Sequence, residues 1–249
     1  MLPSSLLALA MFGTLYGASV LAANQNALVT VLVAPLIALV SSLAVVLGVA
    51  LLKWVLVGRY RPRVEPLWSG FVRRTEFVTG IYEAAAVPAL LTWLTGTPLL
   101  GPLLRLYGAK IGRRTLIDTT YLTEFDLVTL GDDVSVGTNA SLQTHLFEDR
   151  VMKMDHVIIR DRASVGDKSV VLYGSTVEED ATIADLSLVM KGEVLPAGTA
   201  WSGIPAQKVG RAPASTLPVR DDPSLDSPAV DNPTTESRQL STASNSRGV

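Results

Sequence analysis

The chain has two histidines, His145 and His156, and both fall in one segment, residues 143–158. An imidazole titrates near neutral pH, so it can accept a proton and return it within one transfer reaction. Acidic and basic residues fill the space between the two histidines. The chain has no cysteine, which excludes disulfides, thiolate nucleophiles and cysteine-ligated metals. Two histidines are also too few for an all-histidine metal site, so we expect no metal.

Aliphatic residues recur at every sixth position on both sides of this segment. A strand alternates with period two and says nothing about the sixth position, whereas a helix drifts out of register within two steps. The period instead predicts a repeat architecture, in which three hexads make one coil and the aliphatic residues fill a narrow prism. Residues 143–158 are the one long interruption, so we expect a loop that leaves the scaffold and can carry function. The repeated positions are Ile111, Ile117, Leu130, Val136, Leu142, Ile159, Val165, Val171, Val177, Ile183, Val189, Leu195 and Trp201.

The first 52 residues carry no charged side chain. Pro3–Ala23 and Ala27–Leu52 are two apolar stretches separated by a short polar turn, and each has about the twenty residues that cross a bilayer. We expect a transmembrane helical hairpin, with a cleaved signal peptide as the alternative for the first stretch. Basic residues follow the second stretch from Lys53 onward, and the positive-inside rule then places the rest of the chain in the cytoplasm.

A third uncharged stretch, Ala84–Leu104, has two interpretations. It could be a third span, which would move everything after it to the other side of the membrane. We favour an interfacial or re-entrant segment, because helix breakers interrupt the stretch repeatedly. These breakers are Pro88, Gly96, Pro98, Gly101 and Pro102.

Composition agrees with a membrane-attached protein. Of the 249 residues 48% are hydrophobic, and the net charge of −2 hides a neutral, then basic, then acidic order along the chain. An acidic body would repel phosphates, so a nucleic-acid partner is excluded. We therefore expect a transmembrane part (residues 1–52), a basic juxtamembrane linker (53–106), the repeat domain (107–210) and a tail (211–249). The tail is rich in proline and poor in bulky apolar residues, which predicts disorder.

Several short runs in the repeat domain are similar to a known family. Ile111-Gly112, Leu130-Gly131, Val136-Gly137, Val165-Gly166 and the closing run from Trp201 to Val209 resemble the hexapeptide-repeat acyltransferases. The resemblance covers about residues 107–209 and implies a mainly β fold, the left-handed parallel β-helix. It also implies a thioester donor such as acyl-CoA, and trimers with sites between neighbouring prisms.

The same resemblance suggests roles for individual residues. A loop histidine is the general base in these enzymes, which makes His145 the candidate base, with Glu148 or Asp149 orienting its other nitrogen. The pantetheine arm of the donor would lie at the end of the solenoid. The residues at that end are Trp201, Gly203, Ile204, Pro205 and Lys208.

A narrower similarity lies within the same region. The runs Gly108–Gly112, Tyr121–Asp126, Gln143–Lys153 and Met190–Glu193 resemble the membrane-bound terminal region of nonribosomal-peptide-synthetase-like proteins, such as the ε-poly-lysine synthetases. In those proteins an adenylation domain and a carrier domain precede membrane helices and three β-helix domains, which are held to join amino acids. This chain has neither of the preceding domains and only one β-helix.

The resemblance implies acyl or aminoacyl transfer from acyl-CoA or a carrier-bound amino acid to an amine or hydroxyl acceptor. The alternative is a non-catalytic β-helix, either a scaffold or a fragment of a larger synthetase. A single β-helix should then form a homotrimer or bind a partner synthetase. The carboxylates Glu148, Asp149 and Asp155 could hold a cationic acceptor, or they could simply form surface ion pairs. Asp132, Asp133 and the Glu178–Asp180 run resemble calcium ligands, but we expect them to be solvated turn residues.

Overall fold

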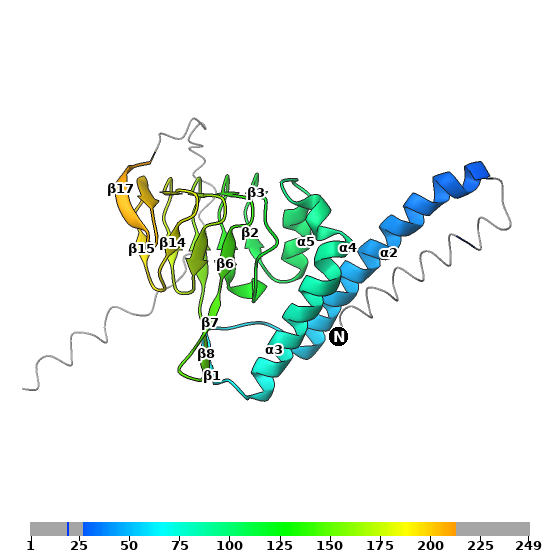
Figure 1. Ribbon diagram of the computed structural model, residues 1–249, viewed down its shortest axis with the longest axis horizontal. Coiled ribbons are helices and arrows are strands. Elements are labelled where there is room, and N and C mark those ends of the chain that lie inside the picture. Colours follow the sequence, from blue (N-terminus) through cyan, green and yellow to red (C-terminus); the bar gives the residue numbers. More distant parts are fainter. Residues whose placement is uncertain (1–18, 20–26, 213–249) are drawn as a thin grey trace, which may run out of the picture. The chain divides into compact units, whose positions relative to one another are not determined.

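The protein is described by a computed structural model that covers residue 19 and residues 27–212 (Figure 1). Side chains of the first helix are described from Val33 onward. The first predicted span (Pro3–Ala23) therefore falls almost entirely outside the described residues, and so does the predicted disordered tail beyond residue 212.

The repeat domain winds into coils whose short strands form three parallel sheets, and one antiparallel strand ends the second of them. Each strand pairs with the strand one coil away, so Ile159 lies opposite Val177 and Val177 opposite Leu195. Three parallel sheets around one axis are typical of the left-handed β-helix, as predicted. The first sheet contains β2 (Lys110–Ile111), β4 (Val128–Leu130), β9 (Val157–Ile159), β12 (Thr176–Val177) and β15 (Val194–Leu195).

The other two sheets complete the prism. The second holds β3 (Leu116–Ile117), β5 (Ser135–Val136), β10 (Ser164–Val165), β13 (Thr182–Ile183) and β16 (Thr199–Ser202), with β17 (Gln207–Arg211) antiparallel to β16 at its end. The third holds β6 (Ser141–Gln143), β11 (Val170–Leu172) and β14 (Leu188–Val189).

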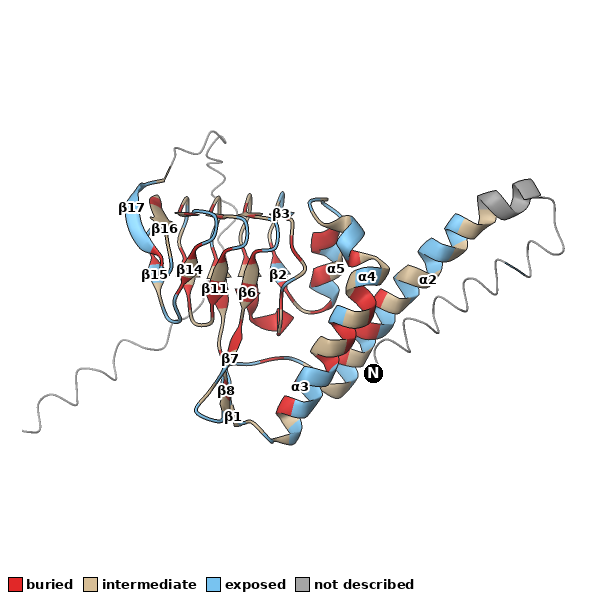
Figure 2. Cartoon of the chain, viewed as in Figure 1, coloured by how far each residue is buried: buried red, intermediate tan, exposed pale blue. Residues whose placement is uncertain are grey.

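The six-residue ladder forms the core, as predicted. Every ladder residue is buried except Trp201, which is partly buried at the last coil. Leu122 is a ladder residue that the six-residue count misses, because it follows Ile117 by five positions; it is fully buried and bridges Leu142 in the third sheet. Burial of one aliphatic side chain contributes about 1.5–3 kcal/mol, so the column supplies most of the driving force for folding. Figure 2 shows the buried residues along the strands of the coils.

Corner residues bind the coils to one another. The Asp161 carboxylate accepts the backbone N–H of Asp132 at 2.8 Å, and Asp167 accepts that of Thr138 at the same distance. Gly131 allows this close approach, because a Cβ there would lie 2.7 Å from the backbone nitrogen of Asp161. Asp132, Asp133, Glu179 and Asp180 of the calcium-like runs lie at turns between the strands. The described residues contain no group of three or more acidic or histidine side chains placed to hold a metal.

A long apolar helix, α2 (Ala27–Leu56), precedes the solenoid. The segment Val33–Leu56 of α2 is long and apolar enough to cross a membrane. No other helix in the described part of the chain meets both conditions. A buried core helix or a signal sequence can share these properties. In α2, however, large apolar side chains stay exposed along much of the helix. They are Leu36, Leu39, Val40, Leu43, Leu47, Leu51 and Val55.

The end of α2 differs from the prediction. Lys53, expected as a charge flanking the membrane, is fully buried, and its Nζ lies 2.5 Å from the Asp126 carboxylate. Asp126 also accepts the backbone N–H of Tyr60 at 3.1 Å. A buried lysine needs a partner of opposite charge, and only the folded chain brings Asp126, 73 positions away, beside it.

The stretch Ala84–Leu104 does not form a third span. It is broken into the π-helical turn η1 (Tyr82–Ala86), α4 (Val87–Ala89), the 3₁₀ turn η2 (Leu91–Leu94) and the start of α5 (Leu100–Leu106), as its helix breakers predict. Leu91, Leu100 and Leu104 are fully buried, and α5 contacts β2 and β3. The segment therefore covers the first coil, where the aliphatic column would otherwise meet solvent. Whether it also touches the membrane surface stays a prediction.

Residues 143–158 form a β-hairpin where a loop was predicted. Strand β7 (His145–Glu148) pairs with β8 (Val151–Met154), and β8 pairs with β1 (Arg63–Pro66). Asp149 and Arg150 at the hairpin turn have φ angles of 51° and 63°, which suit a two-residue hairpin connection. Hydrophobic packing anchors this sheet to α3 (Gly70–Ile81) and to the first coil. The packed residues are Tyr60, Val72, Leu127, Met152 and Met154.

Removing the Lys53 charge should destabilise the protein strongly. Lys53→Met leaves the Asp126 carboxylate buried without its cation, and we expect the free energy of unfolding to fall by about 3–5 kcal/mol. Adding Asp126→Asn should restore most of that loss. Chemical unfolding of the detergent-solubilised chain, followed by tryptophan fluorescence, measures both. Arg59→Met, which removes an exposed cation, is the control; a Lys53→Met variant as stable as this control would contradict the expectation.

Candidate active site

His145 stands at the point where the chain leaves the solenoid. It is the first residue of β7, and one residue, Thr144, separates it from the third-sheet strand β6. His145 is 9% exposed, and its Nδ1 lies 2.7 Å from Oε2 of Glu124. Its Nε2 makes no hydrogen bond to any described residue.

Glu124 holds the histidine from the first coil. It precedes the 3₁₀ turn η3 (Phe125–Leu127), is 1% exposed and has a left-handed backbone with φ of 37°. The Thr144 hydroxyl donates to the same oxygen, Oε2, at 2.6 Å. The other oxygen, Oε1, is buried and has no hydrogen-bond partner among the described residues. Glu124 is therefore a strongly positioned acceptor for the imidazole N–H.

Nearby carboxylates change the protonation of His145. Burial of the ring lowers its pKa, but the hydrogen bond to Glu124 and the charges of Glu124 and Glu76 raise it more, so the net pKa lies above the ordinary value. Burial raises the pKa of Glu76, and the charges of Glu124 and Glu83 add to this, although His145 opposes it. His145 is thus a base whose protonated form is stabilised by its surroundings.

An apolar hollow lies beside the histidine. Phe147 packs edge-on against the His145 ring, with 5.1 Å between ring centres, and also lines this hollow of about 550 Å³. The volume is typical of a small-molecule site. Glu76 and Arg73 are its charged residues, and the rest of the lining comprises Leu67, Trp68, Val72 and Phe77.

The predicted orienting residues, Glu148 and Asp149, do not contact His145. Glu148 pairs with Lys191 at 2.6 Å and with Lys153 at 3.2 Å, and these bonds lower its pKa. Asp149 is exposed at the hairpin turn, 3.4 Å from Lys153. Side chains alternate along a strand, so Glu148, three positions after His145, projects from the other face of β7. The expectation that either residue orients His145 was wrong.

Glu124 is the residue that sequence reasoning missed. It lies in the Tyr121–Asp126 run that carries the family resemblance, but 21 positions separate it from His145 in the sequence. Asp155 is not a free carboxylate either, because its Oδ1 accepts the backbone N–H of His156 at 2.7 Å. The acidic charge available near His145 therefore comes from Glu124 and Glu76.

The predicted donor-binding residues lie at the last coil. Trp201 ends the column and donates from Nε1 to the Thr199 hydroxyl at 2.8 Å. A turn through Gly203, Ile204 and Pro205 leads into β17, which carries an exposed Lys208. Among the described residues, no hydrogen bond or ion pair joins this segment to His145.

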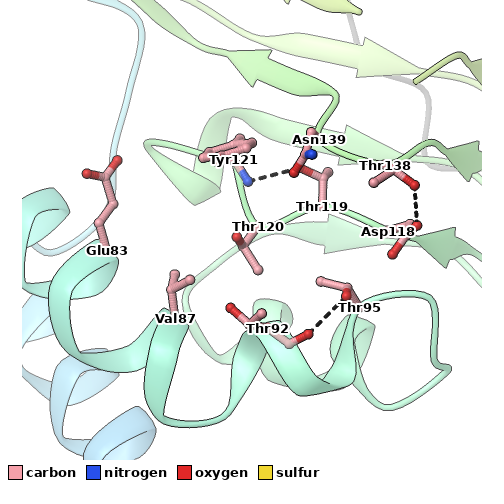
Figure 3. Close-up of a pocket in the computed structure, with 10 residues that line it drawn as sticks. All are labelled: Glu83, Val87, Thr92, Thr95, Asp118, Thr119, Thr120, Tyr121, Thr138 and Asn139. Atoms are coloured by element: carbon pink, nitrogen blue, oxygen red, sulfur yellow. Dashed lines mark hydrogen bonds between the residues drawn. The ribbon is translucent and has the colours of Figure 1, made fainter. Parts of the chain in front are cut away.

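A second hollow, of about 400 Å³, lies between η1–η2 and the first coil (Figure 3). Glu83 and Asp118 are its charged residues, and most of the others carry hydroxyl groups. Sequence reasoning did not identify this site, because its residues come from four separate segments.

The Glu124 charge should control the titration of His145. We expect Glu124→Gln to lower the pKa of His145, measured by NMR in the His156→Gln background, where one imidazole remains. A histidine with a raised folded-state pKa stabilises the fold below its unfolded value of about 6.5, and this contribution is lost as the pH rises through the folded value. The stability difference between wild type and Glu124→Gln should therefore be larger at pH 5.5 than at pH 8.5. The Glu148→Gln variant should leave the histidine titration unchanged, and equal effects of the two variants would exclude a specific role of Glu124.

Comparison with known proteins gives one curated relative. No family model matches the chain. Over 158 residues, or 64% of the chain, it is 46% identical to the delta-poly-L-ornithine synthetase of Acinetobacter baumannii. The match spans only 12% of that protein's length. The strand register and this relative together confirm the resemblance predicted from the sequence.

Solved structures with a similar arrangement are acyltransferases. They include a maltose O-acetyltransferase from Clostridium difficile 630, at 16% identity and a TM-score of 0.40 over 49% of this chain and 83% of that one. A hexapeptide-repeat acetyltransferase from Vibrio cholerae, complexed with acetyl coenzyme A, matches at 17% identity and a TM-score of 0.40 over 53% and 89%. At such scores these likenesses carry no further argument, and the fold assignment rests on the strand register itself.

Proposed function

We propose that this chain transfers an acyl or aminoacyl group from a thioester, with His145 as the general base. The observation that carries the proposal is the buried His145–Glu124 pair, in which Nε2 of His145 has no hydrogen bond to a described residue. Phe147, which packs against the His145 ring, lines a hollow of about 550 Å³. A charged partner on Nδ1 fixes the tautomer that presents Nε2 as the proton acceptor. The relative's name, a synthetase that makes a poly-amino acid, supports transfer of this kind.

The transfer step begins at the imidazole of His145. Neutral Nε2 accepts the proton from the attacking amine or hydroxyl, whose nitrogen or oxygen bonds to the thioester carbonyl carbon. The carbon–sulfur bond breaks, and the thiolate takes the proton back from the imidazolium. The products are an amide or ester and a free thiol. Glu124 stabilises the imidazolium between the two proton transfers.

The donor is an acyl-CoA or a carrier-bound phosphopantetheine thioester, and Trp201, Gly203, Ile204, Pro205 and Lys208 bind its pantetheine arm. We place the complete site between neighbouring copies in a trimer, as the family resemblance implies. Helix α2 anchors the chain in the cell membrane together with the predicted span Pro3–Ala23. The arginines that follow α2 keep the β-helix on the cytoplasmic side.

A non-catalytic role is the second candidate. The chain matches 12% of its relative's length, as a structural module of a larger synthetase would. Such a scaffold would use its β-helix to assemble partners and would leave His145 as a residue that satisfies buried hydrogen bonds.

Replacing His145 separates the two candidates. We expect His145→Ala to reduce transfer from a thioester by roughly 10²–10⁴-fold, because general-base catalysis contributes that much. The base works only when neutral, so the rate should rise with pH, with a midpoint above about 6.5. Glu124→Gln should move that midpoint to lower pH. Thiol release from acetyl-CoA or an aminoacyl-carrier thioester measures both. A His145→Ala variant with normal turnover, or one that fully supports a partner synthetase, would favour the scaffold.

The oligomeric state tests where the site is completed. The chain, purified in a non-ionic detergent, should have the mass of three protomers by native mass spectrometry. A variant of Lys208, Lys208→Ala, mixed with His145→Ala should then regain part of the activity, because mixed trimers contain intact sites. Strictly monomeric chains with full activity would contradict a site shared between copies.

A further inference from the structure

Glu124 holds His145 from an unfavourable backbone conformation. Its φ of 37° and ψ of 62° lie in the left-handed region, which residues other than glycine rarely adopt. Such a conformation persists only where the surrounding structure holds it. The backbone N–H of Leu127 donates to the Glu124 carbonyl at 2.8 Å and closes the η3 turn. The contacts that fix η3 in space therefore decide where the Glu124 carboxylate lies.

Asp126 anchors η3 to helix α2. Asp126 is buried, and its Oδ2 accepts Lys53 Nζ at 2.5 Å and the backbone N–H of Tyr60 at 3.1 Å. Lys53 is the one charged residue of α2, and its Nζ also lies 3.6 Å from the centre of the Trp54 ring. Because separating the pair would leave an uncompensated buried charge on each side, this link is strong.

Phe125 supplies a second link to the same helix. Its ring centre lies 4.9 Å from that of Tyr82 and 4.9 Å from that of Tyr107. The Tyr107 hydroxyl donates to the Val46 carbonyl of α2 at 2.8 Å. Val46 and Lys53 are about two helical turns apart. Both residues that follow Glu124 are thus joined to α2, and two separate attachments prevent rotation about either one.

The charges that act on His145 come from η3 and α3. Burial lowers the pKa of His145, and the hydrogen bond to Glu124 with the charges of Glu124 and Glu76 raises it more. Lys53 and Asp126 form a pair without net charge, and neither is among the groups that shift this pKa. An influence of the pair on His145 must therefore pass through the position of Glu124.

We infer that Lys53 and Asp126 are positioning residues for the catalytic base, through which α2 holds Glu124 against His145. This role rests on the proposed function, because it has catalytic meaning only if His145 is the base. Without the anchor, the η3 turn relaxes from its left-handed residue and the Glu124 carboxylate moves away from Nδ1. His145 then loses the partner that fixes its tautomer and orientation. The base is complete only in a chain whose α2 is seated on the first coil.

The double variant Lys53→Met with Asp126→Asn tests the inference, because it removes the link without changing the net charge. The amide oxygen at position 126 can still accept the Tyr60 N–H. We expect the pKa of His145, measured by NMR in the His156→Gln background, to fall by about half a unit or more toward the ordinary value of about 6.5. In the thiol-release assay kcat should fall about tenfold with little change in KM, because the base is misplaced while substrates still bind.

A stability effect alone would not give this result. Circular dichroism and chemical unfolding identify a double variant that is folded; if it has the wild-type His145 titration, the inference is overturned. Arg59→Met, which removes an exposed cation close by in the sequence, should leave the titration unchanged.

A milder variant covers the case in which the double variant does not fold. Tyr107→Phe removes the hydrogen bond to the Val46 carbonyl without a change of charge, and it should lower the His145 pKa by a smaller amount. An unchanged titration in Tyr107→Phe would then overturn the inference. Normal transfer by His145→Ala would instead contradict the proposed function, whereas the titrations would still show whether α2 positions the imidazole.

Discussion

The fold depends on a register constraint: each two- or three-residue strand is stable only when the next coil pairs with it. Strands this short bury too little and form too few hydrogen bonds to persist alone. The aliphatic residue at every sixth position fixes that register, because a shift by one residue would expose the column. The segment after Tyr82 covers the first coil with Leu91, Leu100 and Leu104, and at the last coil β17 pairs antiparallel with β16.

The candidate site exists because the register resumes after its interruption. Leu142 and Ile159 take their places in the column, so the residues between them must leave the solenoid. They form a hairpin that is held from outside by β1 and α3. His145 at the base of this hairpin is thereby placed against Glu124 of the first coil. A histidine in a mobile loop would lack this fixed carboxylate and this degree of burial.

The helical part and the site are joined through one turn. Glu124 binds His145, and Asp126, two residues later, binds Lys53 of α2. Both carboxylates belong to the same short segment around η3. The packing of α2 and the placement of His145 therefore depend on the same residues. Glu124, which is buried, and Glu76, which is exposed, both raise the pKa of His145, whereas Glu148 is paired with two lysines.

The sequence by itself determined the β-helix, the thirteen ladder positions, the long apolar helix α2 and the broken character of residues 84–104. These follow from periodicity, from the absence of charge and from helix breakers, all of which are local properties that a single stretch of chain expresses. The sequence also placed a histidine, His145, in residues 143–158, where the six-residue repeat is interrupted. Only the tertiary structure decided that Glu124 binds this histidine, that Lys53 is buried, and that Glu148 pairs with two lysines instead. Those contacts join residues that lie far apart in the chain or on opposite faces of a strand, and folding alone sets the distances between them.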